Sequence, residues 1–238
     1  MQRAFVGIIA TLVPVVLILT GARCAMTAWF LKAEYGRSAF PRDQYGLSSE
    51  ERLDYSVQTI AVLLDHPNVT SLRGLTFGAV HEPGRSVAAS EQPDVVFNER
   101  ELRHLADVQG LVQNGWKLWI WASIVLATSV AWATASGRKD LVLRGAALGS
   151  RITLALIAVL LFCVTFGFQR SFVLLHHLML DIPSSSFFEW DSLIRLFPER
   201  LFADASLLSA SIAAAGAIVV ACAAWLASRP TSWTSHQS

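Results

Sequence analysis

The sequence predicts an all-α transmembrane protein, a four-helix membrane bundle that carries a small extracytoplasmic cap domain of α+β structure. Three observations support this prediction. Hydrophobic residues make up 53% of the 238 residues and charged residues only 16%, whereas roughly 25% of a typical globular chain is charged. Four stretches lack charge and are long enough to cross a bilayer as helices. The short segment between the second and third stretches is strongly basic, with four basic residues and one acid.

The four uncharged stretches are 18 to 24 residues long, and a helix needs about 20 apolar residues to cross a bilayer core. We expect the corresponding transmembrane helices over residues 1–31, 117–137, 152–169 and 205–228. The first stretch could instead be a cleaved signal peptide. However, its apolar run is longer than the ~7–15 residues of a signal core, and apolar residues resume after Arg23.

Basic residues predict the orientation. The segment 138–151 holds four basic residues and one acid. Because short cationic loops stay in the cytoplasm, we expect this segment to be a cytoplasmic loop and both termini to be inside, including the tail 229–238. Residues 32–116 and 170–204 are then outside.

The first outer segment, 32–116, is too long for an unstructured connection and is predicted to be a domain. Ser48 and Glu51 have the spacing of a capping box, and apolar residues follow at helical spacing. The stretch 68–94 is rich in Gly, Pro, Ser and Val, which predicts short strands and turns.

A second helix start is predicted at Asn98 and Glu101, and we expect this helix to run directly into the second span. The other outer segment, 170–204, is predicted to lie at the membrane interface. It carries enough aromatic side chains to anchor it there, namely Phe187, Phe188, Trp190, Phe197 and Phe202.

Composition excludes several classes of protein. Basic and acidic residues number 19 and 18, so there is no basic surplus for nucleic acid, and we expect none as a partner. The three cysteines form neither a disulfide framework nor a zinc knuckle. The common hydrolase and nucleotide-binding signatures are absent. We expect no cofactor and no metal.

His104 is the histidine for which the helical pattern predicts which side chains lie beside it. Arg100 lies one turn before it, and Asp107 lies three residues after it on the same side of the helix. A carboxylate beside an imidazole can fix its tautomer and support a positive charge, as a catalytic base requires. The same pattern also fits a partly buried histidine without chemistry.

His176 and His177 follow the third span. Adjacent residues on a helix point ~100° apart, so this pair cannot easily bind one metal ion together. Spacing alone leaves two alternatives open. The histidines could lie at the membrane interface without chemistry, or His104, His176 and an acid could form a zinc site. Arg195 and Arg200 could meet lipid phosphate or be solvated.

Distinctive blocks follow one another along the chain: LKAEY at 31–35, FPRDQYG at 40–46, ERL at 51–53, FNERELRHLADV at 97–108 and DSLIRLFPERLF at 191–202. In order and spacing these blocks resemble a family of bacterial four-span membrane proteins that includes the lipoprotein intramolecular transacylase. The resemblance extends over nearly the whole chain.

The resemblance implies a reaction and two catalytic residues. Enzymes of this family move an acyl chain from the sn-2 oxygen of the diacylglyceryl group of a lipoprotein to the α-amine of its N-terminal cysteine, which gives the lyso-form. The family's two histidines fall on His104 and His176. Counting back from the LFPE block at 196–199 selects His176 rather than His177. Around it the family has FHxxFF, whereas this sequence has LHHLML at 175–180.

The resemblance also implies the surroundings of the reaction. We expect a multi-pass protein of the bacterial plasma (inner) membrane, with its active site on the extracytoplasmic face. Its partners would be diacylated lipoproteins and membrane lipid. From helical spacing we expect Asp107 and Arg100 to support His104, and from its outer position we expect Arg195 to support catalysis or bind substrate. Two other classes stay open: a non-catalytic protein whose outer domain binds a lipid or a partner protein, and a membrane metallohydrolase.

Overall fold

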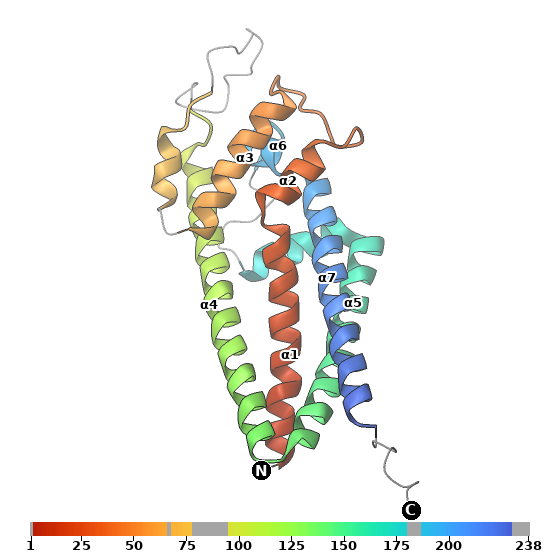
Figure 1. Ribbon diagram of the computed structural model, residues 1–238. Coiled ribbons are helices and arrows are strands. Elements are labelled where there is room, and N and C mark those ends of the chain that lie inside the picture. The colour runs from red at the N-terminus through yellow and green to blue at the C-terminus, as the bar shows by residue number, and fades with distance from the viewer. Residues whose placement is uncertain (1, 66–67, 78–94, 180–186, 230–238) are drawn as a thin grey trace, which may run out of the picture. The chain divides into compact units, whose positions relative to one another are not determined.

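The computed structural model describes residues 2–65, 68–77, 95–179 and 187–229, with the backbone alone over 175–179. Its helices include four that are long and apolar enough to cross a membrane, as the sequence predicts. They are α1 (Gln2–Ala25), α4 (Glu99–Ala135), α5 (Lys139–Met179) and α7 (Glu199–Ala227), labelled in Figure 1.

Shorter helices occupy the segments between the long ones. They are α2 (Ala28–Tyr35), α3 (Ser49–Leu64), the 3-10 helix η1 (Val69–Gly74) and α6 (Ser192–Leu196). The start of α3 is the capping box that the sequence predicts, with the Ser48 hydroxyl accepting from the amide of Glu51 and the Glu51 carboxylate accepting from the amide of Ser48.

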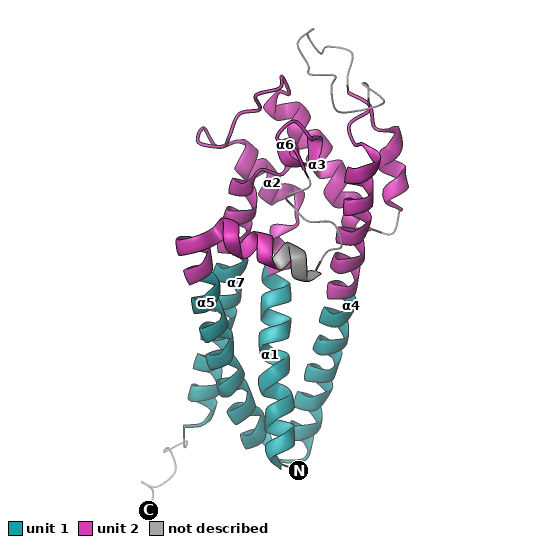
Figure 2. Cartoon of the chain, turned by 180° about the vertical axis from the view of Figure 1, so that it is seen from behind, with its two compact units in different colours: residues 1–21, 117–161, 208–238 teal, residues 22–116, 162–207 magenta. Residues whose placement is uncertain are grey.

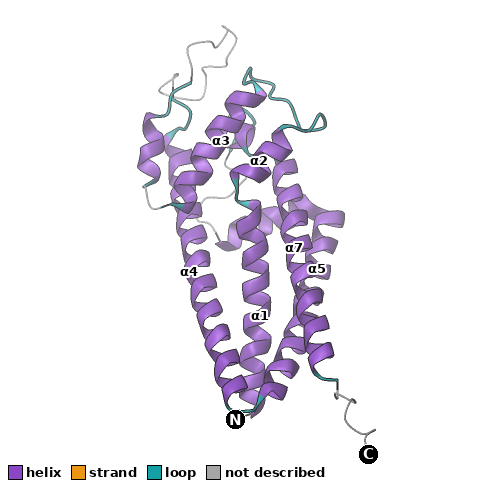
Figure 3. Cartoon of the chain, viewed as in Figure 1, coloured by secondary structure: helices purple, strands orange, loops and turns teal. Residues whose placement is uncertain are grey.

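The α+β prediction for the segment 32–116 is not supported by its described residues. These contain one isolated antiparallel bridge, between Thr76 and Val95, and no strand (Figure 3). Where strands were expected, Val69 and Leu72 are buried at the three-residue spacing of a 3-10 turn. Residues 78–94 of the predicted strand region lie outside the described part of the chain.

The expected cytoplasmic loop at 138–151 is helical from Lys139 onward. Helix α4 ends in a Schellman motif, in which the amide of Arg138 donates to the carbonyl of Ala133 and the amide of Gly137 to that of Thr134. Gly137 has the positive φ of 68° that this motif needs. The next helix follows at once, so three of the four basic residues, Lys139, Arg144 and Arg151, lie within it.

The chain divides into two compact units, coloured separately in Figure 2. Unit 1 contains residues 1–21, 117–161 and 208–238, and unit 2 contains residues 22–116 and 162–207. Helix α5 passes from one to the other and has a kink at Gly167, whose φ and ψ are not helical.

Small residues allow close helix packing within unit 1. A Cβ atom added to Gly149 of α5 would lie 2.8 Å from the Cβ of Val13 in α1. Gly145, one turn earlier, meets Ile9 in the same way, and Gly216 of α7 meets Leu17. This is the G-x-x-x-G arrangement that lets transmembrane helices approach closely.

The core of unit 2 joins segments far apart in the sequence. Leu196 of α6 is fully buried, and Phe97, just before α4, is 2% exposed. They pack in one apolar cluster with Tyr55 of α3, and with Val69 and Leu72 of η1. This cluster fixes the N-terminal end of α4 beside α6.

Candidate functional site

The candidate site is built on the first two turns of α4. Asn98 caps this helix: its side-chain oxygen accepts from the amides of Arg100 and Glu101, each at 3.0 Å. The Glu101 carboxylate returns the interaction by accepting from the amide of Asn98 at 2.9 Å. The predicted cap is therefore confirmed, and it sets the rotation of the helix that carries His104.

His104 is buried in unit 2, with 5% of its surface exposed. Its imidazole packs against the ring of Phe187 at a centroid distance of 5.0 Å and an interplanar angle of 66°. This edge contact is a favoured aromatic geometry. Phe187 precedes α6, so the segment before α6 forms one wall around the histidine.

Arg100 lies one turn before His104 on the same helix. Its guanidinium carbon stands 5.5 Å from the centre of the Phe187 ring and 5.1 Å from that of Phe188. Its Nη2 atom donates to the Asp191 carboxylate at 2.6 Å. Arg100 therefore faces the segment 187–191.

Asp191 joins that segment to α4. One carboxylate oxygen accepts from the Asn98 side chain at 3.3 Å. The other accepts from Arg100 and from the backbone amide of Phe188, the latter at 2.8 Å. The Asp191 side chain is 1% exposed. Such a buried carboxylate requires these partners, since an unpaired buried charge is costly.

Glu101 makes a second connection between α4 and α6. Its Oε1 atom accepts from the amide of Leu193 at 2.7 Å, in the first turn of α6. This interaction satisfies an amide that α6 itself leaves unpaired. Glu101 is 1% exposed, so one buried side chain caps α4 with one oxygen and holds α6 with the other.

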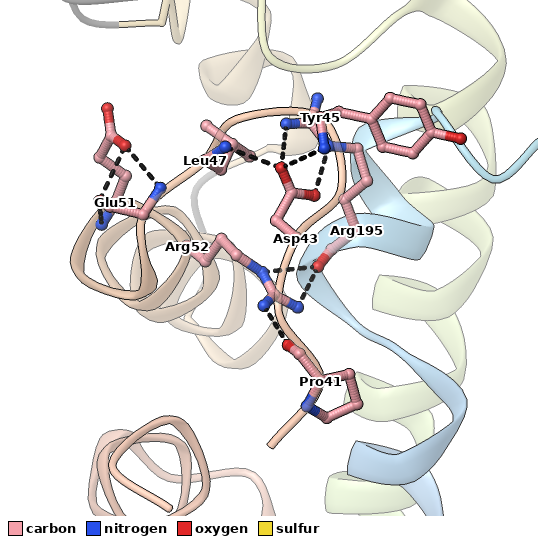
Figure 4. Close-up of polar contacts among 8 residues, drawn as sticks. Pro41, Asp43, Tyr45, Leu47, Glu51, Arg52 and Arg195 are labelled. Carbon is pink, nitrogen blue, oxygen red and sulfur yellow. Dashed lines mark hydrogen bonds and ion pairs between the residues drawn. The ribbon is translucent and has the colours of Figure 1, made fainter. Parts of the chain in front are cut away.

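Arg195 of α6 forms a buried ion pair with Asp43, shown in Figure 4. Two nitrogens of Arg195 donate to the two carboxylate oxygens of Asp43, each at 2.9 Å. The amides of Tyr45 and Leu47 also donate to Asp43. Burial alone would raise the pKa of this carboxyl, but these partners outweigh burial and hold its pKa below the ordinary 3.8.

Further polar contacts hold the backbone at the end of α6. Arg52 of α3 is buried and donates to the carbonyl oxygens of Arg195 and Pro41 (Figure 4). The hydroxyl of Tyr35 donates to the carbonyl of Leu196. Burial raises the pKa of Tyr35.

The predicted site residues are placed as follows. His104 and Arg100 lie on one face of α4, as expected, although Arg100 pairs with Asp191. Asp107 is half-buried, and within the described residues it forms no hydrogen bond or ion pair with His104. Arg195 is neither solvated nor open to lipid phosphate, because its side chain is 4% exposed and paired with Asp43.

The two histidines after the third span lie in the last turns of α5, up to Met179. The side chains of His176 and His177 lie outside the described part of the chain. Arg200 forms an exposed ion pair with Asp204 in the first turns of α7, at 2.7 Å.

Sequence reasoning did not single out the polar residues that surround α6. These are Tyr35, Asp43, Arg52 and Asp191. Glu101 was predicted as part of the cap of α4, but its contact with the amide of Leu193 was not. Each of these residues belongs to one of the blocks that carry the family resemblance. The blocks were therefore the available signal, because no local periodicity marks a contact between distant segments.

A family model described as "Lipoprotein intramolecular transacylase Lit" matches residues 7–202. An "Uncharacterized protein" of Aquifex aeolicus (strain VF5) is 23% identical over 212 residues, which cover 88% of each chain.

The fold is similar to solved structures. The in meso structure of the membrane integral lipoprotein intramolecular transacylase Lit from Bacillus cereus matches with a TM-score of 0.74 over 95% of each chain, at 16% identity. Two structures of that protein with a substituted histidine match with TM-scores of 0.55 at 15% identity. They cover 95% of this chain and 91% and 93% of theirs.

Proposed function

This chain belongs to the lipoprotein intramolecular transacylase family, and we propose that it catalyses the reaction for which the family is named. The match over residues 7–202 carries the proposal. The substrate is a diacylated bacterial lipoprotein, and the acyl chain moves from the sn-2 oxygen of its diacylglyceryl group to the α-amine of its N-terminal cysteine.

In this reaction the two reacting groups belong to one molecule. The lone pair of the neutral α-amine attacks the carbonyl carbon of the sn-2 ester, and the tetrahedral intermediate then breaks its bond to the sn-2 oxygen. The nitrogen loses a proton and the departing oxygen gains one. The products are an amide and a free hydroxyl in an isomer of the substrate. No acyl-enzyme is required, because the lipoprotein already holds ester and amine together.

We assign the proton transfers to His104 and His176. An α-amine has a pKa near ~8 and is mostly protonated at neutral pH, whereas imidazoles with pKa values near ~6.5 can both accept and donate. His104 would deprotonate the amine, and His176 would protonate the leaving oxygen or donate to the oxyanion. The alternative assignment exchanges these two roles. Each such group typically contributes about 10²–10⁴-fold. Asp107 would support a charged His104 when substrate is bound.

The proposal places both termini in the cytoplasm and unit 2 at the extracytoplasmic face, because cationic segments between spans stay inside. The ester of a lipoprotein lies at that outer interface. A reporter enzyme fused after Gly84 would be exported, and one fused after Gly145 would stay in the cytoplasm. The reverse pattern would overturn this orientation.

Tandem mass spectrometry of lipoprotein N-termini, from cells with and without this protein, tests the function. Because the reaction is an isomerisation, we expect an unchanged precursor mass and new fragments with an acyl chain on the α-amine. Identical fragments in both strains would favour the competing class, a protein whose unit 2 only binds a lipid or a partner. Loss of activity on chelation, restored by zinc, would favour a metallohydrolase.

A further inference from the structure

Three contacts in unit 2 connect Asp191 to the imidazole of His104. The Asp191 carboxylate accepts from Arg100 at 2.6 Å. The Arg100 guanidinium stands over the Phe187 ring at 5.5 Å. The Phe187 ring packs on His104 at 5.0 Å. These side-chain contacts form a connected path from Asp191 to His104. Arg100 and His104 are also joined through the backbone of α4.

We propose that Asp191 and Arg100 are positioning residues for His104 and act on it through the ring of Phe187. The inference rests on the proposed function, in which His104 moves a proton. Neither Asp191 nor Arg100 touches the reacting atoms in this account. Their part is to hold Phe187 where its ring limits the rotation of the imidazole.

The turn that carries Phe187 is held through the carboxylate of Asp191. The backbone amide of Phe188 donates to the Asp191 carboxylate at 2.8 Å, which closes the turn that follows Phe187. The Asn98 side chain donates to the same carboxylate at 3.3 Å. Asp191 thus fixes the turn to the first residues of α4, one to two turns before His104.

Arg100 contributes in a way that a lysine cannot. Its planar guanidinium lies against Phe187 and Phe188 while one nitrogen bonds to Asp191. A lysine ammonium is a point charge without a stacking plane. Arg100→Lys should therefore keep the charge and lose the hold on the ring.

Misplacing a catalytic group by about 1 Å can cost about 10²-fold in rate. For Asp191→Asn and Arg100→Lys we therefore expect kcat to fall by about 10–100-fold, with KM within about threefold of wild type. Phe187→Tyr keeps the ring and should stay within about threefold, whereas Phe187→Leu should behave like Asp191→Asn. The matched control is Glu99→Gln, which removes the exposed ion pair with Arg73 in the same helix turn.

The test uses the full-length protein in mixed micelles with a synthetic diacylated lipopeptide, and a readout independent of turnover. NMR of protein labelled at histidine reports the His104 ring, identified as the signal that is missing in His104→Ala. We expect this signal to shift in Asp191→Asn and Arg100→Lys, which keep the Phe187 ring, and to stay in place in Phe187→Tyr and Glu99→Gln.

The outcomes separate this inference from the proposed function. If His104→Ala retains near-wild-type activity, the catalytic role of His104 fails, whatever the spectra show. If His104→Ala is inactive but Arg100→Lys leaves the position of the signal unchanged, or Arg100→Lys and Phe187→Leu keep kcat within twofold of wild type, the positioning inference alone fails. Should Asp191→Asn not fold, these two milder variants still decide the question.

Discussion

Asp43 and Arg195 are 152 residues apart in the sequence and form two hydrogen bonds of 2.9 Å with each other. Their side chains are 1% and 4% exposed. The pair fixes α6 to the segment between α2 and α3. Around it, Arg52 and Tyr35 bind the carbonyl oxygens at the end of the same helix. The short helix α6 is thus held in unit 2 by buried polar contacts as well as by its apolar side chains.

Asp43→Asn should destabilise the protein strongly, because it leaves the buried charge of Arg195 without its partner. Breaking a buried ion pair in this way typically costs about 3–5 kcal/mol. Thermal unfolding in detergent measures the effect. Glu99→Gln, which removes the exposed pair with Arg73, is the control and should cost under about 1 kcal/mol. Equal effects of the two variants would mean that the Asp43–Arg195 pair contributes little.

The contribution of Asp43 should depend on pH in a defined direction. Its pKa in the folded protein is lower than the ordinary 3.8, so the stabilisation is complete above pH 3.8 and is lost as pH falls through the folded-state pKa. The difference in melting temperature between wild type and Asp43→Asn should therefore be constant at neutral pH and shrink below about pH 3.8. A difference that shrinks between pH 8 and pH 6 would contradict this account.

Close helix packing in unit 1 predicts a size limit at Gly149. Gly149→Val should destabilise the protein by about 1–3 kcal/mol or more, as overpacking typically does, because the added atoms overlap with Val13. Gly7→Val is the control, since Gly7 has no atom within 4 Å of an added Cβ. The melting temperatures of the two variants, measured by thermal unfolding, test this prediction. Similar melting temperatures would show that α1 and α5 do not approach closely at Gly149.

His176 and His177 should differ in activity. Adjacent residues on a helix point in different directions, and the count back from the LFPE block assigns the family histidine to His176. We expect His176→Ala to lower the rate by more than 10²-fold and His177→Ala by less than tenfold, under about 1.4 kcal/mol. Acyl transfer to a diacylated lipopeptide is the measurement. An inactive His177→Ala beside an active His176→Ala would move the assignment by one residue.

The long helices could be predicted from the sequence because a membrane requires uncharged runs of a certain length. Their ends could not, since a helix continues past its apolar part. α5 begins at Lys139, in the segment predicted to be a loop, because the Gly137 turn ends α4 and lets the next helix start at once. Charge patterning indicates where a chain leaves the apolar region, not where its helix ends.

The candidate site was predictable only in part, for a similar reason. Local spacing indicated the cap at Asn98 and the shared face of Arg100 and His104. It also suggested Asp107 as the partner of His104, yet the ring that packs on His104 comes from Phe187. Contacts between segments this far apart in sequence depend on the tertiary fold and leave no periodic signal.

We propose that this protein moves an acyl chain within one lipoprotein molecule, with His104 in the proton transfer. A crossover experiment distinguishes this intramolecular transfer from transfer between molecules. Purified protein is given an equal mixture of two diacylated lipopeptides, one with a deuterated sn-2 chain and a heavy peptide, the other unlabelled. The products are sequenced by tandem mass spectrometry.

Wild-type protein should give only two N-acylated products, heavy chain on heavy peptide and light chain on light peptide, and His104→Ala should give neither above about 1% of the wild-type rate. Products with exchanged labels would show intermolecular transfer. The absence of any N-acylated product from the wild-type protein, or undiminished transfer by His104→Ala, would contradict the account.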